Sequence, residues 1–347
     1  MKSRRKTAYN ATPNRGRRLF RKREITVVAA TVAVLVACGV CLRSPVLTRF
    51  VDRATYANDS GSAQTGSSGE SSGGGTTEDW DGSGLTATAI DPARFSAGAC
   101  MAFTPGGGAR KDETVFIDAG HGGIDPGGTG TTQSGAQVEE SAVNLSVALD
   151  AMKALTAAGY RVVLSRTEQT TVVKLGPGDT DGGLLSVQGV EDDIAARDIC
   201  ANDAHANLLA GIYMNAGSPG NAGSVTAYDA ARPFSASNAA FAKLLQTDVL
   251  AKLNGAGYGI PDGGVHNDTE MGSTVTSAGV TYGHLMLLGP AYPAGGFTTP
   301  SGMPGALIEP LFLTDPFEAS IAASGKGQQL IADGMATAVE RYFTTSA

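Results

Sequence analysis

The sequence is poor in aromatic residues, in charged residues and in cysteine. Aromatic residues make up 6% of the 347 residues and charged residues 17%, whereas 47 residues are glycine. This composition favours packing of small side chains and long loops. After residue 42 no Cys-x-x-Cys pair is present, which excludes a structural zinc site of that kind. No internal repeat is present either, so a repeat architecture is excluded.

Basic residues are scarce after the first 24 residues. Residues 1–24 hold ten of the 26 Lys and Arg residues and one acid, Glu24, out of 33 Asp and Glu residues. The remainder therefore carries 16 basic and 32 acidic residues, a net charge of −16. An acidic body argues against nucleic acid as its partner.

The chain has one long apolar run, Ile25–Leu42, which contains no charged residue and follows a basic cluster. Its 18 residues reach the lower limit of the length that spans a bilayer, so residues 25–42 are predicted to be a single-pass anchor. The basic residues before it predict that segment 1–24 is cytoplasmic and that the C-terminal domain is extracellular. Two other interpretations remain open: a lipoprotein box ending at Cys38, and a twin-arginine export signal at Arg17-Arg18. Under either interpretation the part of the chain after residue 42 is still exported, in a lipid-anchored or a secreted form. A buried core helix is the remaining interpretation.

Two chain segments follow the apolar run. Residues 43–112 are predicted to be a Gly/Ser-rich linker and N-terminal extension. The linker contains too few apolar residues to bury a core of its own, so it is expected to act as a flexible tether. Residues 113–347 alternate β-rich runs with helical patterns and are predicted to form a single catalytic domain. The exported part holds two cysteines, Cys100 and Cys200. An isolated pair outside the cytoplasm tends to form a disulfide; two buried free thiols are the alternative.

The alternation predicts an α/β fold with a twisted, mostly parallel sheet and helices on both faces. Chemistry in such folds gathers at the carboxyl ends of the strands. The long segment 167–189 is expected to form a loop near that edge. The expected strands are Thr114–Ile117, Tyr160–Leu164, Leu208–Met214, Ser224–Tyr228, His284–Leu288 and Ala306–Glu309, and the expected helices are Ser141–Ala158, Val190–Ala206, Ser237–Leu253 and Gln328–Phe343.

Three residues near expected strand ends suit metal-assisted hydrolysis. His121 lies in the Gly-rich turn DAGHGGIDPG, Glu140 opens a helix, and Glu309 ends an apolar strand in ALIEPLFLTDP. Two neutral imidazoles and a carboxylate hold Zn²⁺ with an open fourth position for water, and a second carboxylate moves the proton. Asp118 is the expected hydrogen-bond partner of the His121 ring. Taken singly, His121 also suits a loop and Glu140 a helix N-terminus.

These segments resemble the zinc-dependent N-acetylmuramoyl-L-alanine amidase family of the bacterial cell wall. DAGHGGIDPG, EESAVNL at Glu139–Leu145, the segment Ala196–Ala216 and MPGALIEPLFLTDP at Met303–Pro316 match its ordered motifs. The resemblance implies one Zn²⁺ ligated by His121 and Glu140, and Glu309 as the catalytic residue. It also implies peptidoglycan as partner, and hydrolysis of the amide between N-acetylmuramic acid and L-alanine during cell-wall remodelling or cell separation.

Tyr213 departs from the resemblance, because it stands where the family has its second histidine ligand. It is expected either to ligate the metal as a phenolate or to be a core tyrosine. His284 is the first alternative ligand and His266 the second, whereas His205 is expected at the surface. Leu311 replaces a family glycine beside the site. A catalytically weak or inactive relative, which binds peptidoglycan or a partner and regulates wall hydrolysis, is therefore the alternative function.

Overall fold

The computed structural model describes residues 78–80, 84–271 and 274–345. The basic segment 1–24 and the apolar run Ile25–Leu42, with their predicted topology, lie outside the described residues. Within the described part, no helix combines the length and the apolarity needed to cross a bilayer.

The described residues build one nine-stranded sheet in the order β1-β2-β3-β7-β4-β10-β13-β11-β12. Its centre, β7-β4-β10-β13, is parallel, as is the β11-β12 pair, whereas β11 runs antiparallel to β13 and the pairs on the β1 side are antiparallel. The sheet is therefore mixed around a parallel centre, and the predicted α/β fold is confirmed. The strands are β1 Glu78–Trp80, β2 Leu85–Ala89, β3 Ala99–Pro105, β4 Thr114–Ala119, β7 Arg161–Arg166, β10 Leu208–Ile212, β11 Ser224–Tyr228, β12 Asp262–Asn267 and β13 Gly305–Glu309.

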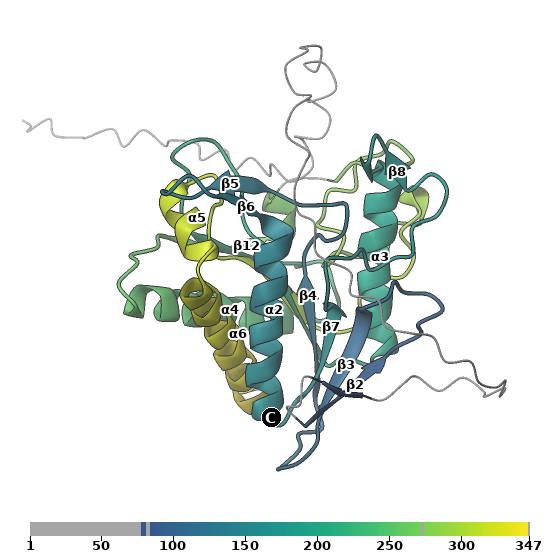
Figure 1. The fold of residues 1–347 in the computed structure, drawn as a ribbon. Helices are drawn as coiled ribbons and strands as arrows, with labels where there is room; N and C mark the ends of the chain where they lie inside the picture. The colour runs from purple at the N-terminus through teal and green to yellow at the C-terminus, as the bar shows by residue number, and fades with distance from the viewer. Residues whose placement is uncertain (1–77, 81–83, 272–273, 346–347) are drawn as a thin grey trace, which may run out of the picture.

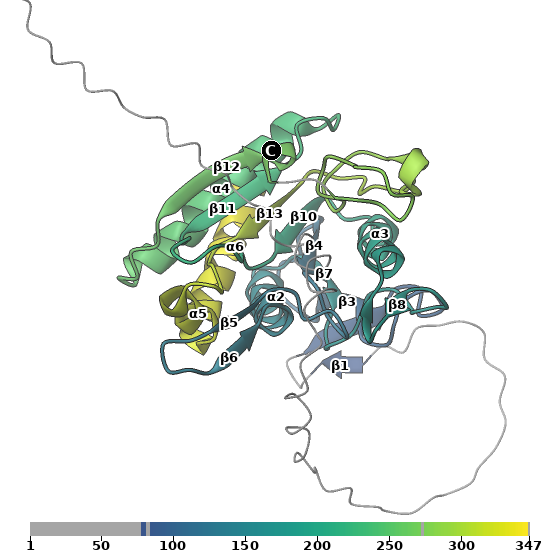
Figure 2. The ribbon, with the colours of Figure 1, turned by 90° about the horizontal axis from the view of Figure 1, so that it is seen from above.

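Helices cover both faces of the sheet (Figures 1 and 2). The helices α2 (Glu140–Ala157), α4 (Ser235–Gly255) and α6 (Gly325–Thr345) share one face, and α3 (Val187–Asp203) lies on the other. The alternation of side chains along β4 explains the two layers, because Val115 and Ile117 pack with the first group and Phe116 packs with α3. Short elements cap the sheet: β5 Thr129–Thr131, β6 Gln137–Glu139, β8 Thr180–Asp181, β9 Leu184–Leu185, α5 Pro316–Ala322, η2 Asp268–Glu270 and η3 Pro293–Gly295.

Local sequence signals set several element ends. Ser186 precedes α3, and its hydroxyl accepts a hydrogen bond from the Gly189 N–H. Asp315 caps α5 in the same way, with Pro316 in the first turn. Gly159, at φ +95°, ends α2 and turns the chain into β7.

Three features differ from the sequence expectation. The sheet begins before residue 113, because β1, β2 and β3 lie within the segment 43–112 and β3 pairs with β7. The expected strand His284–Leu288 is wrong: this apolar run forms turns that pack against the α3 side of the sheet. The Gly-rich segment Asp262–Asn267, which is absent from the expected strands, is strand β12.

The disulfide between Cys100 and Cys200 is present, with a Cα–Cα distance of 5.7 Å. It joins β3 to α3, so the antiparallel edge of the sheet is tied covalently to the helix that covers one face.

Candidate active site

The candidate site lies at one edge of the sheet, where parallel strands end together. The register pairs Ile212 of β10 with Ala119 of β4 and with Ile308 of β13. The residues that follow each strand therefore meet at the same edge, which brings together the His121 turn, Tyr213 and Glu309. Glu140 reaches this edge as the first residue of α2.

His121 is held in a tight turn by its backbone and by two carboxylates. Its φ is +59°, and the following glycines, Gly122 and Gly123, also have positive φ. Its Nδ1 lies 2.7 Å from Asp125 Oδ2, and its Nε2 lies 3.3 Å from Glu140 Oε1. Burial alone lowers the pKa of His121, but the charges of Glu140 and Asp125 outweigh it and raise the pKa to about 10.

Glu140 is fully buried and fixed by backbone groups. Its Oε2 accepts a hydrogen bond from the Gly128 N–H at 2.7 Å, and its Oε1 accepts one from the Met214 N–H at 3.0 Å. Asn144, one turn later on α2, lies 3.4 Å from the same Oε1. The carboxylate is therefore oriented toward the His121 ring before any ligand arrives.

His121 and Glu140 fit two ligand positions of a zinc ion. The buried His121 Nε2 has no hydrogen-bond partner among the described residues. Two donors bound about 2.0 Å from a tetrahedral ion lie about 3.3 Å apart, the separation of this nitrogen and Glu140 Oε1. Gly127 keeps the space open, since a Cβ there would lie 2.6 Å from the His121 ring and 2.8 Å from Glu140 Oε2. Among the described residues, no third His, Cys, Asp or Glu completes this pair.

Glu309 is a second carboxyl group beside the pair. Asn215 Nδ2 donates a hydrogen bond to its Oε2. Burial and the charge of Glu140 raise the pKa of Glu309 to about 8, although the His121 charge and the Asn215 hydrogen bond oppose the shift. A carboxyl group with a pKa near neutral both accepts and donates protons at working pH.

The phenol of Tyr213 is committed to Asp118. Its hydroxyl donates to Asp118 Oδ2 at 2.8 Å, and its ring packs edge-to-face on His121 with the centroids 5.5 Å apart. Asp118 Oδ1 accepts from Arg197 of α3 at 2.8 Å. Burial and the Asp118 charge raise the pKa of Tyr213 well above its usual range. These contacts match the core-tyrosine interpretation; ligation by Tyr213 stays a prediction.

Two sequence expectations about partners need correction. Asp118 is not the partner of the His121 ring, because it projects with Phe116 toward α3; Asp125, in the same turn, takes that place. The structure also does not bring His284 to this edge. His284 contacts Asp229, which follows β11, and β11 runs antiparallel to β13. Val225 pairs with Glu309, so at about 3.3 Å per residue Asp229 lies about 13 Å further along the strand.

The other two histidines also lie elsewhere. His266 is part of the edge strand β12, where its ring contacts Glu270 and the Gly263 carbonyl. His205 follows α3 and is exposed, as expected. Leu311, the residue beside Glu309 that replaces a glycine, is fully buried in the main core.

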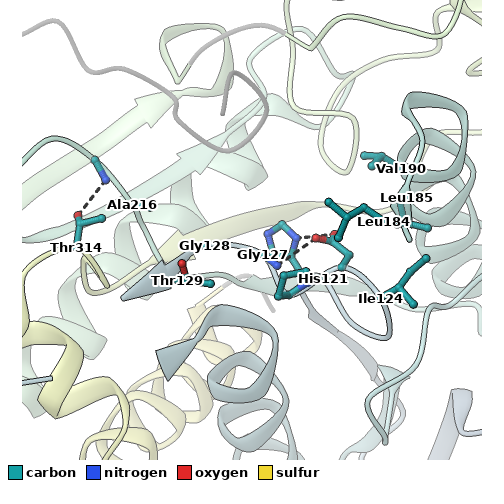
Figure 3. Close-up of a pocket in the computed structure, with 13 residues that line it drawn as sticks. His121, Ile124, Gly127, Gly128, Thr129, Leu184, Leu185, Val190, Ala216 and Thr314 are labelled. Atoms are coloured by element: carbon teal, nitrogen blue, oxygen red, sulfur yellow. Dashed lines mark hydrogen bonds and ion pairs between the residues drawn. The ribbon is translucent and has the colours of Figure 1, made fainter. Parts of the chain in front are cut away.

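A cavity of about 300 Å³ opens beside His121 (Figure 3). One wall is the turn from His121 to Thr129, and the opposite wall is apolar and comes from Leu184 and Leu185 of β9 and from Val190 of α3. The segment 167–189 therefore lies near the site, as expected. The remaining lining residues are Ala216, Gly217 and Thr314.

Sequence reasoning did not identify Asp125 or Asn215 as site residues. Asp125 lies four residues after His121 in the glycine-rich turn, and this spacing is the signal that was available. Asn215 follows Tyr213 by two residues, but its contact with Glu309 depends on the pairing of β10 and β13.

A sheet-edge site with an imidazole and a carboxylate oriented for one ion, and with a separate carboxyl group for proton transfer, defines a hydrolase site. A family model described as N-acetylmuramoyl-L-alanine amidase matches residues 115–341. The chain belongs to this amidase family, and the expected enzyme class is confirmed.

The chain is also similar to solved structures of amidases. The CwlD amidase of Clostridioides difficile, in complex with the GerS lipoprotein, is 18% identical, with coverage of 67% of this chain and 100% of that chain and a TM-score of 0.50. An amidase from Clostridium difficile 630 is 26% identical (68% and 98% covered, TM-score 0.46), and the CwlV catalytic domain from Bacillus (Paenibacillus) polymyxa var. colistinus is 21% identical (67% and 98% covered, TM-score 0.46). A comparison with curated proteins finds no match.

Proposed function

We propose that this protein hydrolyses the amide between N-acetylmuramic acid and the L-alanine of the peptidoglycan stem peptide, with one Zn²⁺ at His121 and Glu140. The substrate follows from the family, and the role is cell-wall remodelling or cell separation. The observation that carries the zinc assignment is the buried, unpartnered His121 Nε2, which faces a carboxylate oxygen at 3.3 Å. A buried polar atom left without a partner is costly unless a ligand completes it.

Zn²⁺, when bound, supplies an activated water and polarises the scissile carbonyl. The protein supplies the rest of the chemistry. His121 and Glu140 would hold the ion, and the Glu309 carboxylate takes a proton from the attacking water. The hydroxyl group bonds to the carbonyl carbon, the C–N bond breaks, and Glu309 returns the proton to the alanine nitrogen. Asn215 positions Glu309, while Asp125 holds the His121 ring.

The test compares zinc content and hydrolysis of purified peptidoglycan in three variants of the full-length protein. His121→Ala is expected to lose one zinc per chain relative to wild type, together with activity. Glu309→Gln is expected to keep zinc and to lose turnover by about 100-fold or more, because the proton carrier is removed while the metal donors stay. Glu139→Gln, a change of the exposed neighbour of Glu140, serves as the control and should match wild type. Zinc at wild-type stoichiometry in His121→Ala would sink the assignment.

A second function, peptidoglycan binding without hydrolysis, is favoured by one observation. Tyr213 stands where a third metal ligand is expected, but its phenol already donates a hydrogen bond to Asp118. A regulator of this kind binds peptidoglycan but holds no zinc at His121 and releases no stem peptide. Zinc analysis of wild type beside His121→Ala separates the two functions, since a zinc ion that His121→Ala loses excludes the regulator.

The location is part of the same proposal. The apolar run Ile25–Leu42 holds the protein in the cytoplasmic membrane as a single-pass anchor, and the amidase domain faces the wall. The supporting observations are the basic residues before the run and the acidic body after it.

A further inference from the structure

A second cluster of potential metal donors lies away from the candidate active site. Asp229 follows β11, Asp268 opens η2 after β12, and His284 belongs to the long loop before β13. One donor atom from each of the three residues lies within 4.8 Å of the others. His284 Nδ1 lies 2.8 Å from Asp229 Oδ2 and 3.2 Å from Asp268 Oδ2. Three segments distant in sequence thus converge on one point.

Backbone groups orient both carboxylates. Asp229 Oδ1 accepts hydrogen bonds from the N–H groups of Ala231 and Arg232 at 2.6 and 2.9 Å, and Asp268 Oδ2 accepts one from Leu285 at 3.0 Å. Both side chains are fully buried. Such fixed carboxylates are typical of a prearranged ligand set, in which hydrogen bonds hold each donor in place.

Asp229 Oδ2 is the unsatisfied atom of this cluster. It is buried and has no hydrogen-bond partner among the described residues. His284 Nδ1 lies 2.8 Å from it as an ion-pair contact, whereas the hydrogen bonds of that nitrogen go to Asp268. A buried carboxylate oxygen without a hydrogen bond of its own indicates a missing third participant.

The charges of the cluster are also unbalanced. Two buried carboxylates face one imidazole, which carries at most one positive charge. The nearby Arg232 acts electrostatically on Asp198, and its guanidinium donates to the backbone carbonyls of Leu288, Gly289 and Ser301. A divalent cation supplies the charge that the pair lacks.

We propose that Asp229, Asp268 and His284 bind a divalent transition-metal ion with a structural role. Two carboxylates and an imidazole suit Zn²⁺ or Mn²⁺ better than the all-oxygen sites of Ca²⁺ and Mg²⁺. The ion fastens the loop that carries His284 to the ends of β11 and β12. This loop lies against the α3 side of the sheet through Leu287 and Leu288. The site is distinct from the candidate active site, because β11 runs opposite to β13.

The experiment measures metal binding by the full-length His121→Ala protein, in which the candidate active site lacks its histidine. Equilibrium dialysis with Mn²⁺ or Zn²⁺ alone is expected to give one bound ion per chain, and the ion raises Tm. Adding His284→Ala should remove both the bound ion and the Tm increase. Adding His266→Ala, which changes a histidine on β12 outside the cluster, is the control and should change neither.

A second variant protects the test against misfolding. Asp229→Asn keeps an oxygen that accepts from the two backbone N–H groups but removes the charge. It should fold, as judged by circular dichroism, and should lose the ion. If His121→Ala binds no ion, or if its ion persists in both double variants, the cluster is only a buried ion pair and the proposal fails. Neither outcome depends on hydrolysis, so the proposed amidase activity is tested separately.

Discussion

The contacts of Tyr213 bear on how a metal ion would be held in the candidate active site. Its ring lies beside His121, so the backbone position is suitable for a ligand, whereas its hydroxyl points to Asp118. A phenol has to ionise before it binds a metal, and burial beside a carboxylate opposes that ionisation. The site therefore starts with two good protein donors, His121 and Glu140.

The first prediction concerns Tyr213→His. A neutral imidazole binds zinc without losing a proton near pH 7, so this variant should bind zinc at least about tenfold more tightly, a gain of about 1.4 kcal/mol. Hydrolysis should rise as well, because Glu309 is already in place. Tyr213→Phe is the matched control: it removes the hydroxyl without adding a donor and should leave zinc affinity unchanged. Equal affinities for wild type and Tyr213→His, measured with a competing chelator, contradict the prediction.

A second prediction concerns pH and the metal-free protein. The folded pKa of Glu309, about 8, lies above its usual value of 4.5. Its stabilising contribution is therefore complete below about pH 4.5 and is lost as the pH rises through 8. His121, with its pKa raised from 6.5 to about 10, acts in the same direction at higher pH. The free energy of unfolding should fall from pH 5 to pH 8 by roughly 1–4 kcal/mol.

Glu309→Gln isolates this effect. The amide carries no charge at any of these pH values, so the variant should lose most of the decrease between pH 5 and pH 8. Urea unfolding in the presence of a chelator measures both proteins, with Glu139→Gln as the exposed control. The same pH slope in Glu309→Gln and wild type contradicts the assignment.

Sequence reasoning placed His121, Glu140 and Glu309 together because all three follow a strand or open a helix at one sheet edge. It named Asp118, and not Asp125, as the partner of the His121 ring. That choice depends on which face of β4 a side chain occupies, and the alternation turns Asp118 toward Arg197. The hydrogen bond from Tyr213 to Asp118 could not be predicted for the same reason, because it also depends on the face of β4 that Asp118 occupies.

At the level of elements, α3 links the edge of the sheet to its centre. Cys200 bonds to Cys100 of β3, and Arg197 bonds to Asp118 of β4 and to Asp193 one turn earlier on the helix. The disulfide and the buried ion pair thus attach α3 to two strands of the sheet, β3 and β4. The position of α3 also determines the apolar wall of the cavity, through Val190.

The third prediction concerns the disulfide. Its ring spans 100 residues, so in the chain-entropy model reduction costs up to roughly 4–5 kcal/mol, and often less in practice. Urea unfolding with and without reductant should show this loss. The Cys100→Ala/Cys200→Ala protein should not respond to reductant. Non-reducing mass spectrometry should find the linked peptides; free thiols at both positions contradict the prediction.

The elements missed from sequence share a physical cause. β12 contains two glycines and has weak strand propensity, and it exists because it pairs with β11. The run His284–Leu288 is apolar enough for a strand, but a short apolar run predicts burial and not conformation. Long periodic helices such as α2 and α6 were found to within a few residues.

At the scale of the molecule, the α/β alternation predicted a sheet with two covered faces, and the parallel centre follows from it. The antiparallel additions on both sides could not be predicted, because they depend on which edge each strand joins. Residues 25–42 lie outside the described part, so the proposed anchor rests on the sequence alone.

The fourth prediction concerns that anchor. Full-length protein should fractionate with membranes, and its C-terminal domain should be open to added protease in spheroplasts. Cys38→Ala should stay in the membrane, since a spanning helix needs no lipid. Removal of residues 1–42 from the gene should leave the protein in the cytoplasm. Release of Cys38→Ala from the membrane contradicts the single-pass anchor and supports the lipoprotein interpretation.

The position of β13 has a consequence for how the cell handles unfinished copies. β13 comes late in the chain, yet it lies between β10 and β11 in the sheet. A copy broken off before Gly305 lacks the strand that joins the two parts of the sheet and also lacks Glu309. Copies that end before Gly305 are therefore expected to be inactive.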